Sequence, residues 1–166
     1  MKKLAVVFCG IVLSVLAGCN NAEPPKIGVV DLVRTVNEST QGKKANAELD
    51  ALVKTKQAEL KEKADAVENL KKSLEKEPPA TKKAKEDELA KAGAEYQQLA
   101  AASDAEVKKK ATELRTKLLE DIKKVLDAVG SEDKLLLILT KENVLYYQNT
   151  IDISDKVIRK YNESSP

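Results

Sequence analysis

Two long stretches without proline, separated by the pair Pro78-Pro79, constrain this chain more than any other feature of its sequence. They cover about residues 40–77 and 81–129, and both are rich in Lys, Glu, Ala and Leu. Proline disfavours the helical region for the residue before it and cannot donate to the helical hydrogen-bond ladder, so the pair ends the first helix. The sequence therefore predicts two long helices joined by a turn at residues 78–80.

Apolar residues recur at steps of three and four positions in both stretches, which places them on one face of each helix. If the chain folds back at the proline pair, partners across the hairpin have residue numbers that sum to about 159. Leu60 with Leu99 and Leu70 with Leu89 fit this register. We therefore expect an antiparallel hairpin over residues 40–129 in place of one continuous rod. Its apolar faces consist of Leu49, Leu52, Val53, Leu60, Val67, Leu70 and Leu74 in the first helix, and of Leu89, Tyr96, Leu99, Val107, Leu114, Leu118, Ile122, Val125 and Val129 in the second.

Short segments with the composition of β-strands flank the helical part on both sides. Residues 26–32 contain Ile and Val in a continuous run, and residues 134–140 are almost entirely aliphatic. A turn after the second run predicts a return strand at residues 144–147. A short helix is expected to follow at about residues 151–161.

These flanking segments predict a small body, made of residues 26–39 and 130–162, that carries the hairpin. Asp31 and Ser39 are placed to accept backbone amide hydrogens at helix starts, and Gly130 is placed to end the second long helix. The predicted fold class is α+β, mainly α, with a long antiparallel helical hairpin on a small β-sheet body. A three-stranded sheet leaves two edges uncovered, so we also expect self-association.

The side chains that carry most enzyme chemistry are missing from this chain. It has no His, and its two Cys, Cys9 and Cys19, both lie near the N-terminus. Histidine acid–base catalysis, disulfides in the body and the usual zinc ligands are thereby excluded. We expect no catalytic residue, no metal and no cofactor, and interpret the protein as a non-enzyme.

The charge balance argues against a second class of function. Lys and Arg number 29 against 27 Asp and Glu, but Lys2 and Lys3 lie in a segment expected to be removed, which leaves 27 of each sign. Nucleic-acid binding depends on a clustered basic surface. We therefore expect no nucleic-acid partner, and interpret the basic clusters at 82–83 and 108–110, which have acidic neighbours, as solvated helix faces.

The N-terminus has the pattern of an export signal. Lys2 and Lys3 precede an apolar run at residues 4–16, which is too short to span a bilayer comfortably. The run ends in Leu16-Ala17-Gly18-Cys19, which resembles the lipobox of bacterial lipoproteins. An ordinary signal peptide with an incidental cysteine is the alternative.

The lipobox resemblance implies cleavage between Gly18 and Cys19 and attachment of diacylglycerol to the Cys19 sulfur. Residues 1–18 are then a cleaved lipoprotein signal peptide, and residues 19–25 form a lipidated tether. In the sorting rule known for some lipoproteins, an Asp directly after the cysteine means retention in the inner membrane. Asn20 occupies this position here, which favours the outer membrane. We expect the mature protein on the periplasmic side of the cell envelope, held by its lipid.

Specific motifs occur at both ends of the mature chain. The first end reads Ile27-Gly28-Val29-Val30-Asp31-Leu32, then Arg34, Asn37-Glu38-Ser39, Gly42-Lys43 and Ala45. The closing end reads Leu135-Leu136-Leu137-Ile138-Leu139, with Tyr146 and Asp152-Ile153-Ser154 after it. Together they resemble the Skp/OmpH family of periplasmic chaperones over about residues 26–162, while the helical middle is generic.

The resemblance implies a jellyfish-like homotrimer, with a β-containing body and three helical tentacles around a cavity. Such a protein would be an ATP-independent holdase that binds unfolded outer-membrane or envelope proteins, with no catalytic residues. Well-studied family members are soluble and strongly basic, whereas this chain is neutral once residues 1–18 are removed. We therefore expect weaker charge steering of its clients.

A structural coiled-coil lipoprotein that acts as a spacer or assembly scaffold of the envelope is the alternative function. Such a spacer needs only helical repeats, whereas this chain has strand-forming segments at residues 26–32 and 134–147. The two ends therefore favour the chaperone. The sequence leaves open which membrane holds the anchor and whether three copies or another number assemble.

Overall fold

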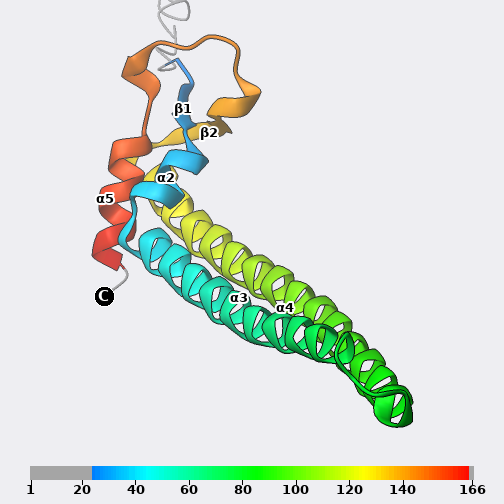
Figure 1. Ribbon diagram of the computed structural model, residues 1–166. Coiled ribbons are helices and arrows are strands. Elements are labelled where there is room, and N and C mark those ends of the chain that lie inside the picture. Colours follow the sequence, from blue (N-terminus) through cyan, green and yellow to red (C-terminus); the bar gives the residue numbers. More distant parts are fainter. Residues whose placement is uncertain (1–23, 165–166) are drawn as a thin grey trace, which may run out of the picture.

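A long two-helix hairpin projects from a small body in this protein (Figure 1). The computed structural model describes residues 24–164. Helix α3 (Thr40–Leu74) runs outward from the body, and helix α4 (Pro79–Asp133) returns to it. The predicted fold class, mainly helical with a small sheet, is confirmed. The predicted cleavage and lipidation residues, Gly18 and Cys19, lie outside the described residues.

Ion pairs between α3 and α4 report the alignment of the hairpin. Lys63 lies 3.2 Å from Glu95 and Lys56 lies 2.9 Å from Glu106. Nearer the body, Lys110 Nζ lies 2.5 Å from Glu48 Oε1. The residue numbers of these three pairs sum to 158, 162 and 158. Side chains that are neighbours across the hairpin therefore follow the register predicted from the proline pair.

The start of α3 is fixed by a cap and by a tight corner. The Ser39 hydroxyl accepts the Gly42 amide hydrogen at 3.1 Å, as predicted. Gly42 is the third residue of α3 and packs against the last turn of helix α2 (Leu32–Glu38), where a Cβ on it would lie 1.6 Å from the carbonyl oxygen of Val36. Only glycine fits at this corner, so the direction in which the hairpin leaves the body depends on one residue.

The end of α4 differs from the sequence prediction. Gly130 does not end the helix, which continues to Asp133 and is capped by Lys134 in the left-handed conformation, with φ 53°. The Lys134 amide donates to the carbonyl oxygens of Gly130 and Ser131. Val129, which precedes the glycine, is fully buried in the core. Beyond the glycine, Glu132 and Asp133 both pair with Lys156 of the C-terminal helix, and these ion pairs favour continuation of the helix past Gly130.

The sheet of the body is smaller than predicted and is parallel. Strand β1 (Lys26–Val30) pairs with strand β2 (Leu135–Thr140), with Gly28 opposite Ile138 and Val29 opposite Leu139. The whole hairpin forms the crossover between the two strands, and such a crossover allows parallel pairing. Within residues 24–164 the sheet has these two strands and one isolated bridge, between Val29 and Asp152.

The predicted return strand at 144–147 is wrong. Residues 141–143 form a short 3-10 helix, η1 (Lys141–Asn143), and a second one, η2 (Asn149–Ile151), follows after an irregular stretch. The free edge of β1 is taken by Asp152, since the Ile153 amide donates to the Val29 carbonyl at 2.9 Å. Residues 144–147 form no strand, and within residues 24–164 the outer edge of β2, with which they were expected to pair, stays open.

Helix α5 (Ser154–Ser164) closes the body, near the range predicted for a short helix. Its buried side chains, Val157 and Tyr161, pack with Val30 of β1 and with Ile122 and Val129 of α4. The Asp152 carboxylate accepts the Ser154 amide hydrogen at 2.9 Å. This small core holds the root of the hairpin against the sheet.

Candidate functional site

Metal-binding groups and membrane-spanning helices are both absent from the described residues. Among residues 24–164, no group of three or more His, Cys, Asp or Glu side chains is placed to hold a metal ion. Over the same residues, every helix is too short or too polar to traverse a lipid bilayer. The candidate functional features are therefore surfaces, and they lie along the hairpin, at its root and on the body.

The apolar face of the hairpin is covered only in part. Near the body, Ala45, Leu118 and Ile122 are buried. Farther out the hairpin is two helices wide, and its apolar residues are half-buried instead. No third layer of residues 24–164 covers this face (Figure 1). The half-buried residues are Leu52, Val53, Leu60, Val67, Leu70 and Leu74 of α3 and Leu89, Tyr96, Leu99 and Val107 of α4.

An open apolar groove lies at the root of the hairpin, where α2 crosses the two long helices. It has a volume of about 530 Å³. Val33 and Leu119 remain 61% and 39% exposed within it, which is unusual for aliphatic side chains surrounded by other apolar groups. Arg115, Asn37 and Glu142 supply a polar margin. The apolar lining consists of Leu32, Val33 and Val36 of α2, Ala45 and Leu49 of α3, and Ala111, Leu114, Leu118 and Leu119 of α4.

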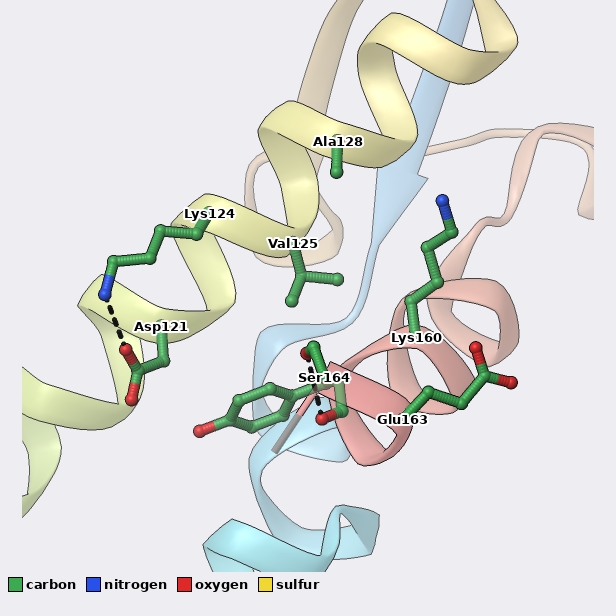
Figure 2. A pocket seen from close by; sticks show the side chains of 8 residues that line it. Asp121, Lys124, Val125, Ala128, Lys160, Glu163 and Ser164 are labelled. Carbon is green, nitrogen blue, oxygen red and sulfur yellow. Dashed lines mark hydrogen bonds and ion pairs between the residues drawn. The ribbon is translucent and has the colours of Figure 1, made fainter. Parts of the chain in front are cut away.

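A second depression, between α4 and α5, has a charged lining (Figure 2). Its volume is about 540 Å³. Asp121 and Lys124 of α4 pair at 2.9 Å, and Lys160 of α5 pairs with Glu132. Burial raises the pKa of Tyr161, and the negative charge of Asp121 raises it further. Because its lysines are engaged by carboxylates, we interpret this depression as a packing seam between the two helices.

Polar bonds tie together the segments that meet at the top of the body. The Asp31 carboxylate accepts the Arg34 amide hydrogen at 2.8 Å, as predicted for a helix cap, and pairs with Lys141 at 3.0 Å. Both bonds hold the pKa of Asp31 below its ordinary value, the backbone bond most. The Ser154 hydroxyl accepts the Asp31 amide hydrogen at 2.9 Å. These contacts link the end of β1 to α2, to the start of η1 and to α5.

Asp152 is the second carboxylate of this polar group. Burial alone would raise its pKa, but hydrogen bonds from Ser154 and from the Tyr147 hydroxyl lower it below the ordinary value. The Tyr147 hydroxyl donates at 3.0 Å. On the side of α2, Arg34 pairs with Glu38 at 3.0 Å and with Asp155 at 2.5 Å. Asp31, Asp152 and Arg34 are thus all engaged in hydrogen bonds or ion pairs with neighbouring segments.

Large apolar side chains are exposed on the body. Leu136 and Leu137 of β2 are 76% and 48% exposed. In the loop between β2 and α5, Leu145 is fully exposed and Tyr146 is 82% exposed. Among residues 24–164, β2 has a strand partner on one side only, which leaves its outer edge open. Exposed apolar surface of this extent commonly marks a contact with another molecule.

Of the residues predicted from the sequence, the proline pair lies at the tip of the hairpin, whereas the groove and the exposed loop were not predicted. Pro78 precedes α4 in an extended conformation and Pro79 is its first residue, at the far end of the hairpin (Figure 1). The groove was not predicted, because its α2 wall meets the long helices only in three dimensions. The exposure of Leu145 and Tyr146 was missed because a strand was expected there.

Comparisons with known proteins agree with the fold. A protein-family profile described as "Outer membrane protein (OmpH-like)" matches residues 26–161. A solved structure from Caulobacter crescentus CB15, provisionally described as an outer membrane chaperone (OmpH-like), superposes with a TM-score of 0.78. The two sequences are 19% identical, and the match covers 90% of each chain. No curated protein matches the chain at the level of sequence.

Proposed function

The chain belongs to the Skp/OmpH family, and from that premise we propose that it is an ATP-independent holdase chaperone of the bacterial cell envelope. In this function it binds unfolded outer-membrane or envelope proteins and keeps them from aggregating until they are inserted. It performs no chemistry on them. The observation that carries the proposal is the half-buried apolar face of the hairpin, which leads into the open groove at its root.

The apolar face is suited to unfolded chains because it is long, shallow and chemically uniform. A folded partner offers one fixed shape, whereas an unfolded chain offers apolar side chains at varying positions. A stripe of Leu, Val and Ala side chains gains free energy from any of them, by about 25 cal/mol per Å² of apolar surface removed from water. The ion pairs that flank the stripe, such as Lys63–Glu95, keep it soluble without adding net charge.

Assembly of three copies would turn this face into an enclosure. A single hairpin surrounds nothing, and its apolar face is open to water along its length (Figure 1). The open outer edge of β2 and the exposed Leu136 and Leu137 support self-association through the body. We propose a homotrimer in which three hairpins, rooted in a shared body, surround the client.

A lipid on Cys19 would station this assembly at a membrane. Seven chain steps separate Cys19 from Lys26, the first residue of β1, and they span at most roughly 25 Å. The body therefore lies close to the bilayer, and the hairpins extend from it into the periplasm. Three anchors in one trimer make the attachment effectively permanent. Asn20 supports the outer membrane as its location.

A spacer or assembly scaffold is the alternative function, and one observation separates it from the chaperone. A spacer buries its apolar surface in a permanent coiled coil, whereas the groove at the root leaves Val33 and Leu119 open to solvent. An open apolar groove on a protein that only sets a distance would be a liability for aggregation. In a holdase, the same groove would bind apolar side chains of the client.

The direct test is suppression of aggregation. A denatured β-barrel protein is diluted into buffer with the delipidated protein, and light scattering is followed with and without ATP. We expect scattering to fall to near the baseline at one trimer per client, with no effect of ATP. Because the mature chain is neutral, added salt should weaken the effect only modestly.

Two matched variants test whether the groove takes part in the suppression of aggregation. Leu119→Asp places a charge among the apolar side chains of the groove, and Thr116→Asp places the same charge nearby on α4, outside it. We expect the first variant to suppress aggregation several-fold less well and the second to match the wild type. Full scattering with the wild-type protein for every unfolded envelope protein tried would support the spacer instead.

A further inference from the structure

The loop that connects β2 to α5 stands apart from the rest of the molecule in its chemistry. Residues 143–151 form the longest run without a charged residue in the described part of a chain that is 34% charged. The run contains Val144, Leu145, two tyrosines and Ile151 among uncharged polar residues. Tyrosine is enriched at the interface between water and lipid, and a run without charges can approach lipid at little cost.

Internal hydrogen bonds hold the loop in one shape while its apolar side chains stay outside. The Val144 amide donates to the Lys141 carbonyl at 3.1 Å, and the Asp152 amide donates to the Asn149 carbonyl at 3.1 Å. The Tyr147 hydroxyl donates a hydrogen bond to the Asp152 carboxylate. Between these fixed points Leu145 is fully exposed and Tyr146 is 82% exposed. The two side chains are therefore presented outward by an ordered support.

The loop lies at the end of the molecule where the chain enters the body. In Figure 1 it arches over the start of β1, at the opposite end from the hairpin tip. Residue Asp152, directly after η2, bridges to Val29 of β1, which fixes the loop beside that strand. Whatever holds the N-terminal end of β1 therefore lies on the same side of the molecule as Leu145 and Tyr146.

We propose that this loop rests on the surface of the bilayer that holds the lipid anchor, with Leu145 and Tyr146 inserted among the lipid headgroups. The inference rests on the lipid anchor of the proposed function. The tether of residues 19–25 is too short to let the body move far from the membrane. A bilayer is thus the apolar partner that is always within reach of this end of the molecule.

The chemistry of the loop favours lipid over a second copy of the chain. Inserting residues 143–151 dehydrates no charged group, since the run contains none. The tyrosine ring suits the headgroup region, where its apolar body and its hydroxyl are both accommodated. A second copy has a separate place to bind, at the open edge of β2 with Leu136 and Leu137. The loop contact would fix the tilt of the body, and with it the direction of the hairpins.

A tryptophan reporter tests the contact, since the chain contains no Trp. Tyr146→Trp places the probe in the loop, and Tyr96→Trp places a matched probe partway along α4. Each lipidated protein is reconstituted into vesicles of phosphatidylethanolamine and phosphatidylglycerol. We expect the emission of the loop probe to shift to the blue in vesicles and to be quenched by bromine-labelled lipids. The emission of the hairpin probe should be the same with bromine-labelled and with ordinary lipids.

A second variant measures the contribution of the loop without a probe. In a chain that begins at Asn20, which lacks both the apolar segment 4–16 and the anchor, we expect Leu145→Ser to lower partitioning onto these vesicles by about ten-fold, the loss that one buried leucine predicts. Unquenched emission of the loop probe in a protein that carries labelled fatty acid overturns the loop contact and leaves the anchor intact. A blue shift without lipid that disappears on dilution also overturns it, and assigns the loop to a second copy. Absence of fatty-acid labelling refutes the anchor itself.

Discussion

The body and the hairpin are stabilised in different ways, although α4 runs through both. In the body, Ile122, Val129 and Tyr161 are almost completely buried, and polar groups such as Asp31 have defined partners. In the hairpin beyond its root, apolar side chains are half-buried and ion pairs are exposed to solvent. Exposed ion pairs contribute little free energy, commonly below about 1 kcal/mol each.

This difference separates the part of the protein that determines its shape from the part proposed to bind clients. A binding surface for unfolded chains must keep apolar area accessible, which lowers what the same residues contribute to stability. The body compensates with close packing over a small volume. Substitutions should therefore cost stability in the body and binding in the hairpin.

The largest effect is expected at the corner between α2 and α3. Gly42→Ala would place a Cβ 1.6 Å from the Val36 carbonyl oxygen, so the corner must open and the cap at Ser39 must break. We expect a loss of more than about 4 kcal/mol in the free energy of unfolding. Gly93→Ala is the control, since nothing lies within 4 Å of the added Cβ, and it should stabilise α4 by up to about 1 kcal/mol. Chemical denaturation measures both, and equal effects would refute the role of the corner.

A smaller difference is expected between matched truncations in the two regions. Ile122→Ala removes a side chain that is 1% exposed and should cost about 2–4 kcal/mol. Leu60→Ala removes a half-buried side chain of the hairpin and should cost about 1 kcal/mol or less. Only the Leu60 variant should bind unfolded clients more weakly per folded molecule. Comparable losses of stability would show that the two regions are not distinct.

Acid should destabilise the body. The pKa values of Asp31 and Asp152 are lowered in the folded protein, so the unfolded chain takes up these protons first as the pH falls. Their stabilisation is complete above the unfolded value near 3.8 and is lost as the pH falls through the lowered folded values. Asp31→Asn should flatten the dependence of stability on pH below about 5, by roughly 1 kcal/mol. Asp65→Asn, which removes an exposed hairpin ion pair, should change the free energy of unfolding at neutral pH by less than about 1 kcal/mol.

The smallest effect is expected at the tip. Replacing Pro78 and Pro79 by alanines changes residues that are exposed and far from the core. We expect a change in unfolding free energy of less than about 1 kcal/mol, together with a small gain in helix content by circular dichroism. Unfolding of the variant would mean that the tip organises the hairpin, against the account given above.

Much of the hairpin could be predicted because local chemistry and tertiary structure agree there. The proline pair determines where the chain turns, and the turn determines which residues of α3 and α4 face each other. The Ser39 and Asp31 caps were likewise predictable, since each uses a hydrogen bond within three residues. These are features for which nearby residues contain the necessary information.

The body was predicted less well because distant contacts override its local preferences. Glycine favours a helix end at position 130, but the helix continues to Asp133, where Glu132 and Asp133 pair with Lys156 of α5. Residues 144–147 have the composition of a strand, but η1 follows directly after β2 in place of the expected turn, and the segment pairs with neither strand. The groove depends on α2 crossing two helices that follow it in sequence, and no periodicity within one segment predicts such a crossing.

The central claim is that the hairpin face and its root groove hold the client, while the outside of the body does not. A photo-crosslinking amino acid at Leu60 or Val33 reports on the first surface, and one at the exposed Arg159 of α5 reports on the second. With an unfolded β-barrel protein and no ATP, we expect strong crosslinks from Leu60 and Val33 and few from Arg159. Equal crosslinking from all three positions, or crosslinks from Arg159 alone, would contradict the account.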